Sequence, residues 1–325
     1  MWRFFLRRAL FFVFTLIFTS VIVFLLVRVL PGDVARVIAG GREAPQERVD
    51  RVREDLGLDE PLPVQYLNWV SGFVQGDWGT SSAFRGEDNR ELILQRLRNS
   101  ARLAGLALLI AVPLSITLGV IAGLTEGQVP DNVISIGTLS VVSLPEFVTG
   151  LFLINTVALR WQDNPIAERF GWFPASSSVP ADATFGEALP ALWLPAITAT
   201  LVMLAYVARL TRAGVIEELK RDYVRTAALK GIPRWQVLVG HVLRNALLPT
   251  ITVIAISTTW LVSGLVVIEF VFGYPGLGSA LITAITRRDL LLIQAITIVT
   301  VSVVLVANFL ADVLYAVVNP RIKLE

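Results

Sequence analysis

The sequence predicts an all-α membrane protein with six transmembrane helices. Its 325 residues are 54% hydrophobic and 17% charged, with a mean hydropathy of +0.67, which is the composition of a multispanning membrane protein rather than a soluble domain. A helix needs about 20 apolar residues to cross the bilayer core. Six segments meet this requirement, at roughly 9–30, 101–124, 133–159, 189–210, 246–270 and 290–318.

The first predicted span follows three arginines, Arg3, Arg7 and Arg8, as the core of a secretory signal does. Its apolar run is too long for a signal core, and it ends at 28–33 without a small-x-small cleavage site. We therefore expect residues 1–31 to form an N-terminal tail and a retained first transmembrane helix.

The charge distribution predicts which loops face the cytoplasm. Residues 209–244 carry eight lysines or arginines and three acids, and both chain ends are basic. By the positive-inside rule, this loop and both termini are expected on the cytoplasmic side of the membrane. Residues 32–99 and 160–188 hold more acids than bases and are expected outside. The loop at 125–131 fits poorly, because it holds Glu126 and Asp131 and no cation.

The outer segment 32–99 is expected to form a small helical cap. Helical periodicity is visible at 46–56 and again at 65–74. In the second of these helices, Tyr66 and Trp69 favour anchoring to membrane lipid at the interface over direct contact with substrate. Residues 100–325 are expected to form the transmembrane core.

The residue inventory excludes common enzymatic sites. The chain has no cysteine and a single histidine, His241, so it can form neither a thiolate site nor an H-E-x-x-H zinc site. It contains no Gly-Lys-Ser/Thr ending of a phosphate-binding loop, and its net charge of +2 gives no reason to expect nucleic acid binding. We expect a chain that is not an enzyme and that takes its energy from a partner. An oligomeric channel is a remote alternative.

The basic loop between the fourth and fifth spans has an ordered helix-turn-helix pattern. Residues 217–230 predict a short helix with an i,i+4 pair between Glu217 and Arg221. Gly231 suits the left-handed position after a helix, and Pro233 suits the start of the next helix, which runs toward the fifth span. The small side chains of Ala227 and Ala228 would let another protein approach the corner. A loop that merely sets topology or touches anionic lipid is the alternative.

This loop resembles the cytoplasmic coupling motif of binding-protein-dependent ABC importer permeases. Only Ala227, Gly231 and Leu243 match the general motif of those permeases. The departures agree with the dipeptide and oligopeptide branch, through Asp-Tyr-Val-Arg-Thr-Ala at 222–227 and Leu-Arg-Asn-Ala-Leu-Leu-Pro at 243–249. Similar agreement extends along most of the chain, at 28–33, 56–59, 61–66, 76–81, 173–176, 272–278 and 319–322.

The resemblance implies a type I ABC importer permease fold, with coupling helices at about 217–245. It implies two ATP-binding subunits that hold ATP and Mg, a second homologous permease subunit that usually makes a heterodimer, and an extracytoplasmic substrate-binding protein. This chain would itself bind no cofactor and no metal. Di- or oligopeptides are the expected cargo, with nickel chelates, glutathione or oligosaccharides as alternatives.

The resemblance also implies two sets of functional residues. The residues expected to couple to the ATPase are Asp222, Tyr223, Arg225, Thr226, Ala227, Ala228 and Gly231. The family places the substrate path between the two permease subunits, and the candidates here are Ser143, Glu146, Thr259 and Ser263. Glu146 departs from the smaller or apolar residue that the family favours after Ser-Leu-Pro, which bears on the identity of the cargo.

Overall fold

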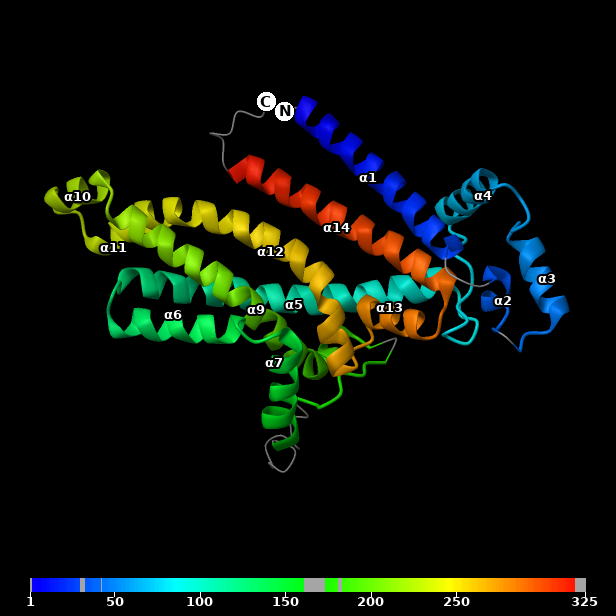
Figure 1. Cartoon of the computed structure of the whole chain (residues 1–325). Helices are drawn as coiled ribbons and strands as arrows, with labels where there is room; N and C mark the ends of the chain where they lie inside the picture. Colours follow the sequence, from blue (N-terminus) through cyan, green and yellow to red (C-terminus); the bar gives the residue numbers. More distant parts are fainter. Residues whose placement is uncertain (1, 30–32, 42, 161–172, 181–182, 319–325) are drawn as a thin grey trace. The chain divides into compact units, whose positions relative to one another are not determined.

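The computed structural model describes residues 2–29, 33–41, 43–160, 173–180 and 183–318. Within these ranges the side chains of residues 2–5, 29, 252, 255, 259–264 and 314–318 are not described. The described residues form helices and turns (Figure 1), with an isolated β-bridge between Thr80 and Asp88. Contacts divide the chain into two compact units, Met1–Ser100 with Pro275–Val306, and Ala101–Tyr274 with Ala307–Glu325.

The first unit combines helices from the N-terminal third of the chain with helices from its C-terminal part. The N-terminal helices are α1 (Trp2–Val29), α2 (Val34–Ile38), α3 (Gln46–Asp55) and α4 (Leu62–Gln75), and the C-terminal ones are α13 (Leu277–Thr286) and the first part of α14 (Leu290–Val318). The helices predicted at 46–56 and 65–74 are confirmed as α3 and α4. Helix α4 starts after Pro61 and ends at Gly76, whose φ of +95° is the left-handed conformation that glycine adopts most readily.

Aromatic side chains join α4 to α1 within this unit. The ring of Phe24 is buried, and its centroid lies 5.5 Å from that of Tyr66 and 5.8 Å from that of Trp69. The guanidinium of Arg28 lies 4.4 Å from the Phe24 centroid, and its Nε donates to Gln65 Oε1 at 3.1 Å. These rings therefore contribute to packing inside the unit.

The second unit is built around a long buried helix, α9 (Phe185–Leu219). It also contains most of α5 (Asn89–Leu124), as well as α6 (Val129–Val142), α7 (Glu146–Leu153), π-helical η1 (Ile154–Leu159), α10 (Asp222–Leu229), α11 (Arg234–Val237), π-helical η2 (Leu238–Val242) and α12 (Leu243–Phe272). In the most apolar 18-residue stretch of α9, about 72% of the residues are buried. This helix therefore forms the centre of the unit.

Glycines allow the backbones of α5, α9 and α12 to touch. A β-carbon at Gly119 of α5 would lie 2.5 Å from the carbonyl oxygen of Ala208 in α9. A β-carbon at Gly214 of α9 would lie 2.5 Å from the carbonyl oxygen of Ala246 in α12. Small residues at such crossings give close van der Waals contact between membrane helices. The core of this unit therefore has no room for larger side chains at these positions.

Among the described residues, five helices are long and apolar enough to cross a membrane, and two bent helix pairs bring the number to as many as seven. The predicted number, six, lies within this range. The segment 133–159, predicted as one span, is not straight, because α6 meets α7 with η1 at an angle of 102°, which makes it a broken span or a re-entrant loop. Pro145 precedes α7 and causes the break, since proline cannot donate a backbone hydrogen bond and disfavours a helical conformation at Leu144.

Candidate coupling surface and substrate cavities

A helical corner, which we call the elbow (residues 220–242), connects α9 to α12. Figure 1 shows α10 and α11 projecting together at the ends of these two long helices. The predicted single helix over 217–230 is wrong, because α9 continues to Leu219 and α10 starts anew at Asp222. The pair between Glu217 and Arg221 is confirmed, with Nη2 and Oε1 2.8 Å apart. It therefore spans the break between the two helices.

The turn after α10 is a Schellman motif centred on Gly231. Gly231 has a φ of +73°, its N–H donates to Ala228 O at 3.0 Å, and the N–H of Ile232 donates to Ala227 O at 3.2 Å. These two bonds pair backbone carbonyls that the end of α10 would otherwise leave without a partner. The left-handed backbone conformation at position 231 favours glycine over other residues. The predicted left-handed position of Gly231 is confirmed, and Pro233 immediately precedes α11, as expected.

The elbow has a small apolar core of its own. Ala227, Val237 and Val242 are buried. Four partly buried residues pack against them: Leu219, Val224, Ile232 and Leu238. Because α11, η2 and α12 follow one another without an intervening loop, this core fixes the elbow to the start of α12. A displacement of the elbow would therefore move α12 with it.

The outer surface of the elbow is basic and partly apolar. Leu229 and Trp235 are 82% and 66% exposed, which places them among the most exposed large apolar side chains in the described part of the chain. Exposed basic residues lie close to them in the chain, at Arg225, Lys230 and Arg234. An exposed aromatic ring, an exposed aliphatic side chain and nearby arginines are the composition of a protein-binding surface.

The predicted coupling residues divide between the surface and the interior of the elbow. Five are exposed: Asp222, Arg225, Thr226, Ala228 and Gly231. Ala227 belongs to the elbow core, so the expectation that both alanines open the corner to a partner is wrong for Ala227 and holds only for Ala228, which is exposed. Tyr223 is half-buried, and its hydroxyl donates to Glu218 Oε2 at 2.7 Å. Burial and this nearby carboxylate raise the pKa of Tyr223, since both disfavour the phenolate.

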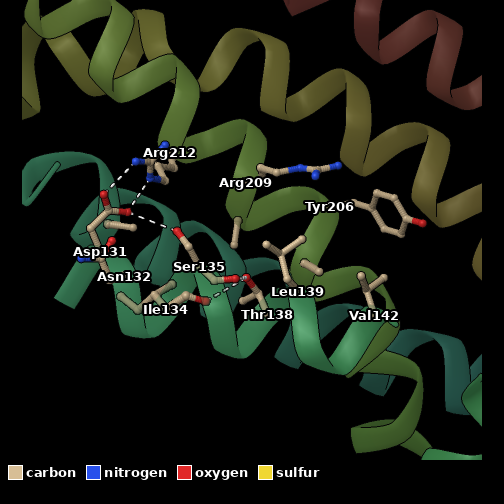
Figure 2. A pocket seen from close by; sticks show the side chains of 13 residues that line it. Asp131, Asn132, Ile134, Ser135, Thr138, Leu139, Val142, Tyr206, Arg209 and Arg212 are labelled. Atoms are coloured by element: carbon tan, nitrogen blue, oxygen red, sulfur yellow. Dashed lines mark hydrogen bonds and ion pairs between the residues drawn. The ribbon is translucent and has the colours of Figure 1, made fainter. Parts of the chain in front are cut away.

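A buried ion pair fixes the start of α6 to α9 (Figure 2). Asp131 is 2% exposed, and Arg212 Nη2 lies 2.7 Å from Asp131 Oδ2. The N–H of Gly127 and the hydroxyl of Ser135 donate to the same carboxylate at 2.9 and 3.2 Å. This carboxylate is thus well compensated for its burial.

A second ion pair joins the same two regions, with Lys220 Nζ and Glu126 Oε1 3.1 Å apart. Both acids of the 125–131 loop are therefore neutralised by cations from α9 or its C-terminal end. This pairing accounts for the acidic loop that fitted the positive-inside rule poorly.

Two cavities lie beside α6 and α9 in the second unit. The first, of about 330 Å³, is bordered by the Asp131–Arg212 pair and by Arg209 and Tyr206. The second, of about 560 Å³, is lined by Ser143 and Glu146 with apolar side chains of α9 and α12. Tyr206 and Val142 line both cavities, so the two adjoin.

The structure brings together two of the four predicted path residues, Ser143 and Glu146, at the junction of α6 and α7. The other two, Thr259 and Ser263, lie in α12 but outside the described side chains. The sequence interpretation did not identify Tyr206 or Ser257 as neighbours of Glu146. Both lie among apolar residues of long helices that also carry other polar side chains, and no local signal distinguishes either one.

Comparisons with known proteins define the class. Residues 115–324 match the model of the family described as binding-protein-dependent transport system inner membrane component, and residues 1–84 match the N-terminal model of such membrane components. The chain therefore belongs to this family, the membrane permeases of binding-protein-dependent ABC importers.

Several relatives match over nearly their whole length. A probable peptide ABC transporter permease of Sinorhizobium fredii, y4tP, is 34% identical over 98% of each chain. The dipeptide transport system permease DppB of Escherichia coli is 34% identical over 99% of each chain. The glutathione transport system permease GsiC of Pectobacterium atrosepticum is 35% identical, also over 99% of each chain.

Proposed function

We propose that this permease is a membrane subunit of a peptide importer and that ATP-binding subunits drive its movement. We further propose that the elbow is the surface to which an ATP-binding subunit docks. The observation that carries the proposal is the elbow itself. Its backbone is capped at Gly231, its core is closed by Ala227, Val237 and Val242, and its outer face exposes Leu229 and Trp235. A surface fixed in shape before binding loses little conformational entropy on docking.

In this proposal, ATP and Mg are bound by two partner subunits, and the chain itself catalyses no reaction. When ATP draws those subunits together, the elbow transmits their movement directly to α12, and through the Lys220–Glu126 and Arg212–Asp131 pairs to the start of α6. Two arrangements of the helices, each favoured by a different ligand, would provide the alternation that transport requires. The elbow and both termini would lie on the cytoplasmic side, and residues 32–99 outside.

The cargo we propose is a di- or oligopeptide delivered by an extracytoplasmic binding protein, since relatives named for peptide and dipeptide transport align over 98–99% of the chain. Glutathione is the second candidate because relatives named for its transport align equally well. A second homologous permease subunit would complete the path, with Ser143 and Glu146 lining this chain's side of it and Thr259 and Ser263 as further candidates.

The docking proposal is tested by shortening the two exposed apolar side chains. We expect Leu229→Ala and Trp235→Ala to release the ATP-binding subunits during purification and to abolish peptide uptake in reconstituted vesicles, because truncation of central apolar residues typically costs about 2 kcal/mol or more of binding. Leu109→Ala is the matched control, since Leu109 is 72% exposed on α5, away from the elbow. Retention of the ATP-binding subunits by both elbow variants would contradict the proposal.

The path proposal has a separate test. Glu146→Gln removes one negative charge beside the larger cavity, so it is expected to change the relative uptake of cationic and anionic dipeptides while leaving ATP-binding subunits attached. Unchanged selectivity would remove Glu146 from the path.

A further inference from the structure

The charges that line the first cavity, between α6 and α9, do not cancel. Its charged lining residues are Asp131, Arg209 and Arg212. Asp131 and Arg212 form the ion pair described above. The N–H of Gly127 and the hydroxyl of Ser135 occupy the same carboxylate, so it has no free charge to offer another cation. One positive charge therefore remains in the cavity, that of Arg209.

Arg209 is a cation without a partner in the described part of the chain. It is exposed, and no ion pair or hydrogen bond engages its guanidinium among those residues. Charged residues in or near a membrane-spanning stretch commonly face a water-filled cavity and mark a transport route or binding site. An arginine that faces lipid headgroups would set the topology equally well. The place of Arg209 in a cavity wall therefore indicates a further role.

A second unused donor lies beside Arg209. Tyr206 precedes it by three residues, so the two lie on the same face of α9. Figure 2 shows both side chains extending in one direction, away from the ion pair. Tyr206 is 53% exposed, and its hydroxyl forms no hydrogen bond within the described residues. The small side chains of Ala205 and Ala208, which also line the cavity, leave space next to these two donors.

Both donors suit an anion. The guanidinium presents a planar fork of N–H groups that matches the oxygens of a carboxylate or a phosphate, and a phenol hydroxyl donates to the same oxygens. Leu139 and Val142 make part of the wall apolar, which weakens the screening of the charge on Arg209 relative to an open surface. The lining therefore attracts an anionic group and repels a cation.

We propose that the first cavity is a binding site for one anionic group, with Arg209 as its counter-ion and the Tyr206 hydroxyl as a second hydrogen-bond donor. The anion arrives through water from the second cavity, since Tyr206 and Val142 border both cavities. The proposal rests on the proposed substrate path and extends it from Glu146 past Tyr206 to Arg209. A molecule on this route would meet an acidic residue in one cavity and a basic residue in the next.

The test uses a single introduced thiol, because the chain contains no cysteine. Leu139→Cys places it in the cavity wall on α6, where Leu139 is 46% exposed. The intact transporter in phosphatidylcholine nanodiscs is treated with sulfonatoethyl or trimethylammonioethyl methanethiosulfonate, which are similar in size and opposite in charge. Each rate of modification of this chain is divided by the rate of the same reagent with free cysteine. We expect the anionic reagent to react faster.

Adding Arg209→Gln should lower the ratio of anionic to cationic rates about fivefold or more, the effect of one charge about 4 Å away in water. Arg209→Lys, which keeps the charge, should preserve most of the ratio, and Tyr206→Phe should lower it less than Arg209→Gln does. The matched control is Arg48→Gln, since Arg48 is an exposed arginine of α3 that does not line the cavity. It should leave the ratio unchanged.

Three results would overturn the proposal. The first is a ratio that Arg209→Gln does not change, and a lowered thermal midpoint alongside it would assign Arg209 a structural role. The second is no reaction of Leu139→Cys with either reagent, which would show that water does not enter the cavity. The third is an anionic preference that disappears when phosphatidylglycerol is added to the nanodiscs, which would assign the site to a lipid phosphate.

The measurement needs neither cargo nor attached ATP-binding subunits. Failure of the docking test or of the Glu146→Gln test would therefore leave its result interpretable. Failure here would remove the anion site and leave the proposed functions of the elbow and of Glu146 unaffected.

Discussion

The helix core at α5, α9 and α12 and the elbow that joins α9 to α12 are stabilised in opposite ways. In the core, glycine lets backbones touch, so a β-carbon at Gly119 or Gly214 would lie 2.5 Å from a carbonyl oxygen. At the elbow, Gly231 has open space around it and is needed only for its left-handed backbone. The core thus tolerates no added volume, whereas the elbow depends on its backbone shape and keeps its outer face free for a partner.

The largest effect is expected from adding volume to the core. Gly214→Val should destabilise the permease by about 3 kcal/mol or more, because its β-carbon would collide with the Ala246 carbonyl, which is backbone and cannot rotate away. Folded yield and thermal midpoint after detergent extraction measure the effect. The control is Gly137→Ala in α6, where a β-carbon would meet no atom within 4 Å. Equal yields of the two variants would show that the core is not tightly packed.

The next largest effect concerns the ion pair that links α6 to α9. Asp131→Ala should cost about 2–3 kcal/mol, since Arg212 would lose its partner in a partly buried position. The double variant Asp131→Ala, Arg212→Ala should cost less than the sum of the two single changes, with a coupling energy of about 1–3 kcal/mol. Thermal unfolding of all four proteins gives this energy. Simple additivity would mean that the pair does not hold the helices together.

A smaller cost in stability but a larger loss of function is expected at the turn of the elbow. Gly231→Val should cost about 1–2 kcal/mol, because a β-branched residue is strained at a φ of +73°. We expect it to uncouple peptide uptake from ATP hydrolysis while the subunit remains inserted. Gly231→Asn is the conservative comparison, since asparagine tolerates this conformation better. Normal coupled transport by the valine variant would contradict a mechanical role for the elbow.

The smallest effect is expected at Tyr223, which supports the elbow from inside. Tyr223→Phe should cost about 0.5–1.5 kcal/mol through loss of the hydrogen bond to Glu218. The pKa of Tyr223 is raised, so the folded protein favours the neutral phenol. This contribution is therefore present below a pH of about 10, the ordinary pKa of tyrosine, and is lost as the pH rises above it.

The difference in thermal midpoint between wild type and Tyr223→Phe should accordingly shrink above that pH. A difference that stays constant between pH 8 and 11 would show that the hydroxyl does not contribute in its neutral form.

Features carried by local residue chemistry could be predicted from the sequence. The apolar runs predicted the membrane helices, and Gly231 with Pro233 predicted the corner of the elbow. The break between α9 and α10 could not be predicted, because no glycine or proline marks it. It depends on the elbow core and on the contact between Tyr223 and Glu218, which form only when α10 folds back.

Long-range pairings of side chains could not be predicted from the sequence for a related reason. Asp131 and Arg212 are 81 positions apart, and nothing near Asp131 identifies its partner. The bend before α7 was visible as Pro145, but the continuous apolar run suggested one straight span.

The most direct test of the elbow as a docking surface is site-specific photo-crosslinking in the assembled transporter. A benzoylphenylalanine placed at Leu229 or Trp235 is predicted to form a covalent adduct with an ATP-binding subunit, and one placed at Leu109 is predicted to form none. Adducts with lipid alone, or no adduct, from both elbow positions would contradict the central claim.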